Sequence, residues 1–397
     1  MFTSSLRWFG VTGWGAALAA LLGAALVVGC GGGGSSAPTE TASSYTEGPV
    51  SGFGSVIVNG VRFDESAATV EDEDGVVQAS SELKLGTMVE IDASDVRNAV
   101  ARALRFRFST DLVGPVNSID ATASTLVALG QTVDVTSTTV FADDLPGGLD
   151  GLTTGTVVGV HAHFDASNGH YVATRIDARP NAPLYRLRGI VSHLDTTAKT
   201  FQIGGEVISY ANVPAGDLPN NFADGLRVRT RLLKTQVNGQ WVAVTVRHGV
   251  RRLDDLPQAH LRGIVSSFTS ATQFAVNGIN VDASNASFPD GTAGIVLGAR
   301  VEVEGRAQNG MIVARTVELD DDRKFELHRF ELHGAISGLD TTAKTFMLRG
   351  VKVNYNAAVA FVNGTASDLA NDRKVEVRGV LAVDRRVLVA VIIKFEN

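Results

Sequence analysis

Hydrophobic and polar residues alternate along short stretches of the chain after residue 48, and such stretches occur in pairs around a turn. Phe274 and Val276 precede Asn277-Gly278, while Ile279 and Val281 follow it. A period of two is typical of a half-buried β-strand, and Asn-Gly supplies the positive φ angles of a two-residue hairpin turn. The pattern therefore predicts antiparallel hairpins.

The hairpin recurs at a regular interval. The octapeptide Leu194–Phe201 is repeated unchanged at Leu339–Phe346, and related sequences lie near residues 119–126 and 268–274. The turn glycines follow the same period, about 72 residues, at Gly60, Gly130, Gly205, Gly278 and Gly350. A fixed period of this length indicates an array of small structural repeats.

Each unit has the same internal order. It opens with a glycine and an apolar strand, as in Gly263-Ile264-Val265, and continues through the hairpin into a variable connector with room for one short helix. A valine-rich strand such as Val301–Gly305 follows, and a second hairpin around Asn309-Gly310 closes the unit. The fold class predicted is all-β, a tandem array of about five small antiparallel β-barrel (OB-like) domains. Stacked small β-sandwiches are the alternative, because the same alternation permits them.

These landmarks divide the chain into a leader, a tether and five units. Gly52 precedes its turn glycine by 8 positions, where the other units have 15 or 16, so the first unit is expected to be divergent with a shortened first strand. The predicted segments are a signal peptide at 1–29, a Gly/Ser-rich tether at 30–48, and repeats at 49–108, 111–180, 184–249, 258–320 and 328–397.

The first thirty residues predict export and lipid attachment. Residues 8–29 carry no charge and follow Arg7, as in a signal peptide. Val27-Val28-Gly29-Cys30 resembles the bacterial lipobox, which implies cleavage between Gly29 and Cys30 and acylation of the Cys30 thiol. An ordinary membrane helix containing a buried cysteine is the alternative. The residue after Cys30 is Gly31 and not aspartate, which favours sorting to the outer membrane.

Composition narrows the function classes. The chain has 397 residues, 44% of them hydrophobic, so it can bury cores and is not disordered. Its net charge of -7 lacks the basic excess that a phosphate backbone requires, so no nucleic-acid partner is expected. With one cysteine the chain is not a disulfide scaffold.

Candidate chemistry is sparse. His161, His163 and His170 fall on a predicted hairpin, where they could hold zinc or copper. A hairpin that is merely rich in histidine is the alternative, which we favour because no matching hairpin repeats it. The acidic runs Glu71–Gly75 and Asp320–Asp322 lack the ligand spacing of a calcium loop and are expected to be solvated turns.

No catalytic constellation is apparent. The sequence has no Gly-x-Ser-x-Gly elbow, and its cysteine is assigned to the anchor. Glutamates on the Val-Glu-Val strands match an ordinary outward face. We therefore expect no cofactor and no enzymatic activity.

The block Gly52–Phe63, followed by units ending in Val-Glu-Val-x-Gly, resembles bacterial lipoproteins built of domain of unknown function 5666. The resemblance implies a β-rich protein of the periplasm or cell surface and brings no active site with it. The expected function is a lipid-anchored, non-enzymatic envelope protein that binds or scaffolds, with the membrane and an envelope protein or polysaccharide as partners. Oligosaccharide or small-ligand binding through a barrel face is the alternative.

Overall fold

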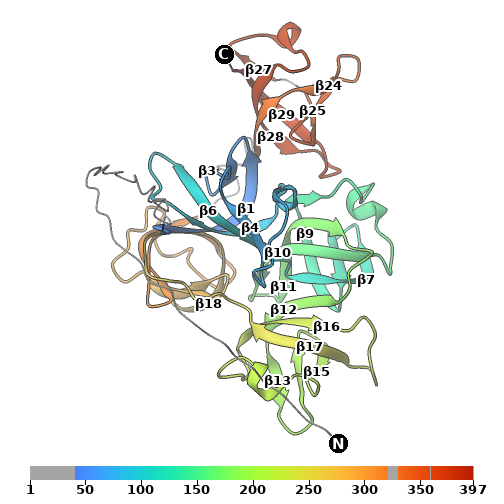
Figure 1. The fold of residues 1–397 in the computed structure, drawn as a ribbon, viewed down its shortest axis with the longest axis vertical. Coiled ribbons are helices and arrows are strands. Elements are labelled where there is room, and N and C mark those ends of the chain that lie inside the picture. The colour runs from blue at the N-terminus through green and yellow to red at the C-terminus, as the bar shows by residue number, and fades with distance from the viewer. Residues whose placement is uncertain (1–40, 321–329, 358, 397) are drawn as a thin grey trace, which may run out of the picture. The chain divides into compact units, whose positions relative to one another are not determined.

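The computed structural model describes residues 41–320, 330–357 and 359–396, and these residues fold into strands and short 3-10 turns (Figure 1). No α-helix occurs in these ranges, and none of their segments forms a helix long and apolar enough to cross a membrane. The predicted signal peptide and nearly all of the tether lie outside the described residues.

The strands fall into five groups, which we call repeats 1 to 5. Repeat 1 contains β1 (Ser44–Phe53), β2 (Val56–Val58), β3 (Val61–Asp64), β4 (Thr69–Asp72), β5 (Met88–Ala93) and β6 (Val100–Phe108). Repeat 2 contains β7 (Leu112–Asp120), β8 (Thr125–Ala128), β9 (Gln131–Phe141), β10 (Val157–Asp165) and β11 (His170–Ala178). Repeat 3 contains β12 (Tyr185–Ile190), β13 (Ser192–Asp195), β14 (Thr200–Ile203), β15 (Glu206–Ser209), β16 (Arg227–Leu232) and β17 (Trp241–His248).

Repeats 4 and 5 complete the described chain. Repeat 4 contains β18 (Leu256–Ser270), β19 (Gln273–Val276), β20 (Ile279–Asp282), β21 (Arg300–Gln308) and β22 (Met311–Leu319). Repeat 5 contains β23 (Phe330–Ala335), β24 (Ser337–Asp340), β25 (Thr345–Leu348), β26 (Val351–Asn354), β27 (Ala360–Val362), β28 (Lys374–Leu381) and β29 (Leu388–Phe395). Four of the connectors hold a single 3-10 turn, at η1 (Ser80–Glu82), η2 (Gly148–Gly151), η3 (Ala215–Asp217) and η4 (Ala366–Asp368).

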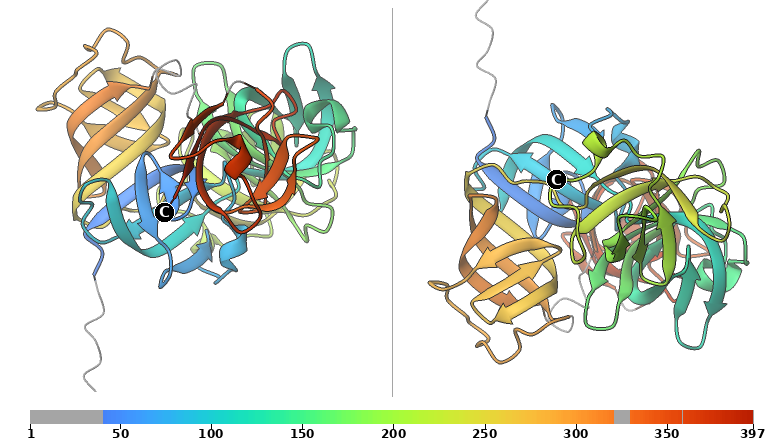
Figure 2. Two further views of the ribbon diagram at one scale, coloured as in Figure 1. Left: turned by 90° about the horizontal axis from the view of Figure 1, so that it is seen from above. Right: turned by 90° about the horizontal axis from the view of Figure 1, so that it is seen from below.

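Strand pairing inside each repeat returns to its starting strand. In repeat 2, β7 pairs with β8, β8 with β9, β9 in parallel with β11, β11 with β10, and β10 with β7. The other repeats have the same order, with their third and fifth strands parallel. Figure 2 shows the strands of repeat 5, in red, wrapped around such a ring.

A β-bulge accompanies this closure in every repeat. The pairing of the fourth strand with the fifth shifts register at the same place each time, between residues 92/93, 161/162, 231/232, 304/305 and 378/379. A bulge bends its strand and increases the local twist, which lets a short sheet curl upon itself. The glycine that ends the predicted Val-x-Val-x-Gly strand is this bulge in repeats 4 and 5.

The alternating apolar residues form the cores, as their spacing predicts. Phe201 and Phe346, from the repeated octapeptide, are 0% and 1% exposed. Repeats 1, 4 and 5 each bury a separate cluster, whereas repeats 2 and 3 share one. Each cluster is small, so contacts between repeats matter for the stability of the whole.

Strands of different repeats pair with one another. In repeat 1, β1 pairs in parallel with β18 of repeat 4 and with β23 of repeat 5, while β7 of repeat 2 pairs with β12 of repeat 3. Strand pairing therefore joins the described repeats into an 18-stranded and an 11-stranded sheet. The predicted tandem array of discrete barrels is therefore corrected: the repeats are joined to one another by strand pairing.

The first strand of repeat 1 is not shortened, contrary to the sequence-based prediction. β1 spans ten residues and begins at Ser44, inside the predicted tether. The glycine of repeat 1 that is equivalent to Gly263 is Gly48 instead of Gly52. A Cβ on Gly48 would lie 2.2 Å from the side-chain oxygen of Asn59, and a Cβ on Gly263 would lie 2.2 Å from that of Asn277. The shorter spacing arises because β1 and β2 are joined by the two residues between Phe53 and Val56.

The contact at Gly48 fixes the tip of the hairpin. Asn59 adopts a positive φ of 50° in the turn, and its Nδ2 donates to the carbonyl of Glu47 at 2.8 Å. In repeat 4, Asn277 Nδ2 donates to the carbonyl of Arg262 in the same way, at 3.3 Å. A side chain on the glycine would expel the asparagine from this position.

We expect Gly48→Ala to lower the free energy of unfolding by about 1–3 kcal/mol, because the added methyl group overpacks the turn. Gly205→Ala is the matched control, since a Cβ there meets nothing within 4 Å and the φ of Gly205 is not positive. Urea unfolding of both full-length variants measures the difference. Equal stability of the two would contradict the role assigned to Gly48.

Candidate functional site

In repeats 1, 3, 4 and 5, one pair of strands presents an outer face that carries charged side chains. The first and fourth strands pair in antiparallel fashion with a glycine opposite a valine, as in Gly48↔Val89 and Gly263↔Val301. The side chains one and three positions before that glycine, with their cross-strand partners, point away from the core. We call this set the ribbon face.

The ribbon faces share a register but differ in charge. Their residues are Tyr45, Glu47, Glu90 and Asp92 in repeat 1; Arg186, Arg188, Arg229 and Arg231 in repeat 3; His260, Arg262, Glu302 and Glu304 in repeat 4; and Glu331, His333, Glu376 and Arg378 in repeat 5. Like charges opposite one another destabilise a sheet. The faces of repeats 1 and 3 therefore require countercharges from elsewhere.

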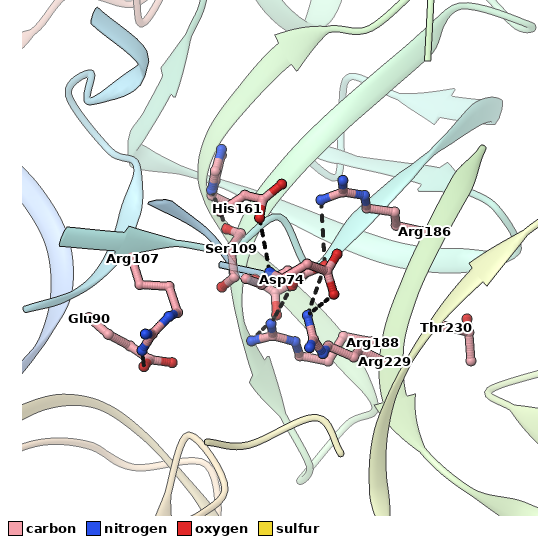
Figure 3. Close-up of polar contacts among 12 residues, drawn as sticks. Asp74, Glu90, Arg107, Ser109, His161, Arg186, Arg188, Arg229 and Thr230 are labelled. Carbon is pink, nitrogen blue, oxygen red and sulfur yellow. Dashed lines mark hydrogen bonds and ion pairs between the residues drawn. The ribbon is translucent and has the colours of Figure 1, made fainter. Parts of the chain in front are cut away.

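The acidic turn of repeat 1 supplies them to repeat 3. Glu73 lies 2.7 Å from Arg188 and 3.4 Å from Arg186. Asp74 lies 3.1 Å from Arg229 (Figure 3). Asp74 also pairs with Arg231. The prediction of a solvated turn at Glu71–Gly75 was wrong, because this turn docks on the four arginines of another repeat.

A second, deeper group of charges lies where repeats 1 to 4 meet. Asp111 is 3% exposed, lies 3.8 Å from Arg188 and 3.7 Å from Arg227, and accepts the backbone N–H of Ala162. Burial raises the pKa of Asp111, and the two guanidinium groups oppose that shift. Burial likewise lowers the pKa of Arg227. We refer to these groups, with Glu47 and Glu90, as the ionic junction.

Glu47 is a second carboxylate of the junction whose pKa is raised. It accepts hydrogen bonds from Tyr45 Oη at 2.9 Å and Asn277 Nδ2 at 3.1 Å. Burial and the neighbouring Glu90 raise the pKa of Glu47 to about 7. A 20 Å³ cavity borders Glu47, Glu90, Asp111 and Arg227, enough for one water molecule, and Nε and Nη1 of Arg227 are buried there without a hydrogen-bond partner.

The three histidines of the predicted hairpin do not form a ligand set. His161 Nδ1 lies 2.6 Å from the carbonyl oxygen of Ser109 (Figure 3), and His163 Nδ1 lies 3.1 Å from Asn277 Oδ1. His170 Nδ1 lies 2.9 Å from Asp134 Oδ1. Burial lowers the pKa of both His161 and His163 to about 4, so at neutral pH they are uncharged parts of the contacts between strands and repeats.

Two other groups of side chains in the described ranges do bring possible metal ligands together. They are His260, Glu302 and Glu304 in repeat 4 and Glu331, His333 and Glu376 in repeat 5, each with ligand atoms within 4.8 Å of one another. Sequence reasoning missed both, because each group joins residues of two strands that lie about 40 residues apart in sequence. The alternating Val-Glu-Val pattern was the available signal.

Two larger hollows border the ribbon faces. A cavity of about 490 Å³ is bounded by repeats 1, 2, 4 and 5, with His163, Arg262, Arg300, Glu302 and Arg378 among its lining residues. A polar groove of about 680 Å³ runs beside the docked acidic turn, with Arg107, Arg229, Arg247 and Arg251 in its wall. Both have the size of small-molecule sites.

The raised pKa of Glu47 predicts a specific pH dependence. Between pH 4.5 and about 7 the folded protein holds a proton that the unfolded chain has released, so this group's contribution to stability falls as pH rises through that window. Glu47→Gln removes the free-energy cost of ionising this carboxylate in the folded protein. Because the residue as a whole is only half-buried, we expect Glu47→Gln to raise the free energy of unfolding by about 1–3 kcal/mol at pH 8 and by nothing at pH 4.

Urea unfolding of both proteins across this range gives the difference curve, from which other titrating groups that the two proteins share cancel. Asp64→Asn is the control for loss of one carboxylate, since Asp64 is exposed and lies outside the junction. A difference between wild type and Glu47→Gln that does not change with pH would contradict the shifted pKa.

The other residues predicted from the sequence are those of the lipidation site and the turn glycines. Gly29 and Cys30 lie outside the described residues. Gly60, Gly130, Gly278 and Gly350 occupy hairpin turns with positive φ, whereas at Gly204-Gly205 only Gly204 has a positive φ.

Comparison with known proteins gives a family but no activity. A search of curated proteins found no match. Among solved structures, Drosophila Unr CSD456 aligns over 53% of this chain and 97% of its own, with 12% identity and a TM-score of 0.14. The family described as Domain of unknown function (DUF5666) matches residues 47–105, 113–177, 262–318 and 333–394, four of the five repeats. The first match includes Gly48, and the chain belongs to the DUF5666 family.

Proposed function

We propose that this protein is a non-enzymatic bacterial envelope lipoprotein, in which OB-type barrels are assembled into one scaffold on a lipid tether. The observation that carries the proposal is the ionic junction. The described residues within Glu40–Asn397 form a single compact unit, in which repeats 1, 2 and 3 contribute charges to one junction and repeat 4 contributes Asn277. A fixed array presents several surfaces in a constant arrangement, as a scaffold requires.

The strand order supports the assignment of each repeat to the OB type. Five strands that pair in the order 1-2-3-5-4-1, with a connector between the third and fourth strands, match that barrel. OB-type barrels carry many functions, so the fold alone does not favour catalysis or binding. Here the side chains on the ribbon faces differ between repeats, and many of them are engaged in contacts between repeats.

Lipid attachment rests on the sequence at Val27–Cys30. Several acyl chains on the terminal cysteine would satisfy the requirement of more than one membrane signal for stable anchoring. The start of β1 at Ser44 leaves residues 31–43, rich in glycine and serine, as the spacer between lipid and scaffold. We place the protein at the outer membrane, on the periplasmic or outer surface.

The anchor is tested by Cys30→Ser expressed in a Gram-negative bacterium. Wild type is expected in the membrane fraction and to incorporate a palmitate analogue, whereas Cys30→Ser is expected without label and either soluble or unprocessed. Ser36→Ala, a tether change, serves as the control and should behave as wild type. Normal labelling and fractionation of Cys30→Ser would refute lipidation.

Ligand binding is a second candidate function, and the 490 Å³ cavity favours it. Its wall combines apolar residues such as Ile57 and Val172 with charged ones such as Arg378, which suits a small polar ligand or one end of an oligosaccharide. A flat carbohydrate surface is less well supported, because Phe268 is the only exposed aromatic side chain among the described residues.

Glycan arrays and small-metabolite libraries can be screened with the full-length protein and two cavity variants. Thr138→Trp fills the cavity wall, so saturable binding in the cavity should be lost; Ser137→Trp, at the exposed neighbouring residue, should retain it. Binding that survives Thr138→Trp would place the ligand elsewhere.

A further inference from the structure

The geometry points to a divalent metal site on the ribbon face of repeat 4, made of His260, Glu302 and Glu304. Their ligand atoms lie within 4.8 Å of one another, and His260 Nε2 is 2.5 Å from Glu302 Oε1. This inference is independent of the scaffold proposal and differs from the histidine hairpin that the sequence suggested.

The backbone holds the three side chains in place. β18 and β21 pair so that His260 is opposite Glu304, and Glu302 is two residues from Glu304 on the same face. Both strands are central members of the closed sheet of repeat 4. Ligands carried by paired strands keep their spacing better than ligands on loops.

The donor set suits zinc. Imidazole nitrogens and carboxylate oxygens are both zinc ligands, and catalytic zinc sites combine three protein ligands with an open fourth position. A cavity of about 310 Å³, with Tyr45 and Gly60 of repeat 1 in its wall, adjoins all three residues. The open position would face this cavity and take water or a small anionic ligand.

The surrounding charge distinguishes this group from its counterpart in repeat 5. There, Glu331 pairs with Arg62 and Arg378, and Glu376 pairs with Arg378 and Lys394, so positive charge already balances the carboxylates. In repeat 4, Arg262 is opposite Glu302 and pairs with Asp320, while Glu304 pairs with Arg315, whose side chain is 75% exposed. An exposed ion pair of this kind contributes little, so a metal ion can displace it.

A titration with cobalt tests whether repeat 4 holds this metal site. Full-length, untagged protein is stripped with a chelator and titrated with Co²⁺ alone, followed by Zn²⁺. We expect one equivalent of Co²⁺ with the intense visible absorption of four-coordinate cobalt, which Zn²⁺ abolishes. His260→Ala and Glu302→Gln should weaken binding by roughly tenfold or more.

Two further variants make the outcome specific. Arg315→Ala removes the competing cation and should tighten Co²⁺ binding, an effect that general destabilisation would not produce. His333→Ala, in the charge-balanced group of repeat 5, should leave binding unchanged. If His260→Ala fails to fold, the half-exposed Glu304→Gln tests the same site.

Several results would overturn the proposal. These are the absence of the cobalt spectrum in wild type, retention of it in His260→Ala, or an equal loss in His333→Ala. Loss of the spectrum only in Cys30→Ser would assign the bound ion to the thiol instead.

Discussion

The arrangement of this protein depends on pairing charges that its strands would otherwise leave in mutual repulsion. Four arginines occupy neighbouring positions on β12 and β16, and Glu73 and Asp74 from another repeat neutralise them. Removing one partner from a buried ion pair leaves an uncompensated charge, which costs several kcal/mol. The contact therefore acts less as a source of net stability than as a constraint on which repeat can occupy that place.

The need to pair these charges accounts for where the repeats diverge in sequence. The glycine opposite a valine and the bulge recur in every repeat, on the strands that close each five-stranded ring. The outward residues beside that glycine vary from acidic to basic to mixed. Repeats of one fold thus differ where they meet one another, and wrong pairings would bring like charges together.

Much of the secondary structure was predictable because its signals are local. Turn glycines, alternation and the repeated octapeptide placed hairpins and buried residues such as Phe201 correctly. The start of repeat 1 was missed because Ser44–Gly48 is polar, although it is a strand paired on both sides, with β5 and β18. The ionic junction and the His260 group were out of reach, since they depend on register between strands and on contacts between repeats far apart in sequence.

The pairing of β1 has a consequence for biogenesis. Ser44 pairs with Gln258 and Gly52 with Glu331, so a strand that is synthesised early waits for partners that are synthesised late. Until then β1 exposes an unsatisfied edge, which is a template for misassociation. Contacts of such high sequence separation also slow folding. The newly synthesised chain is therefore open to misassociation at this edge until repeats 4 and 5 have been made.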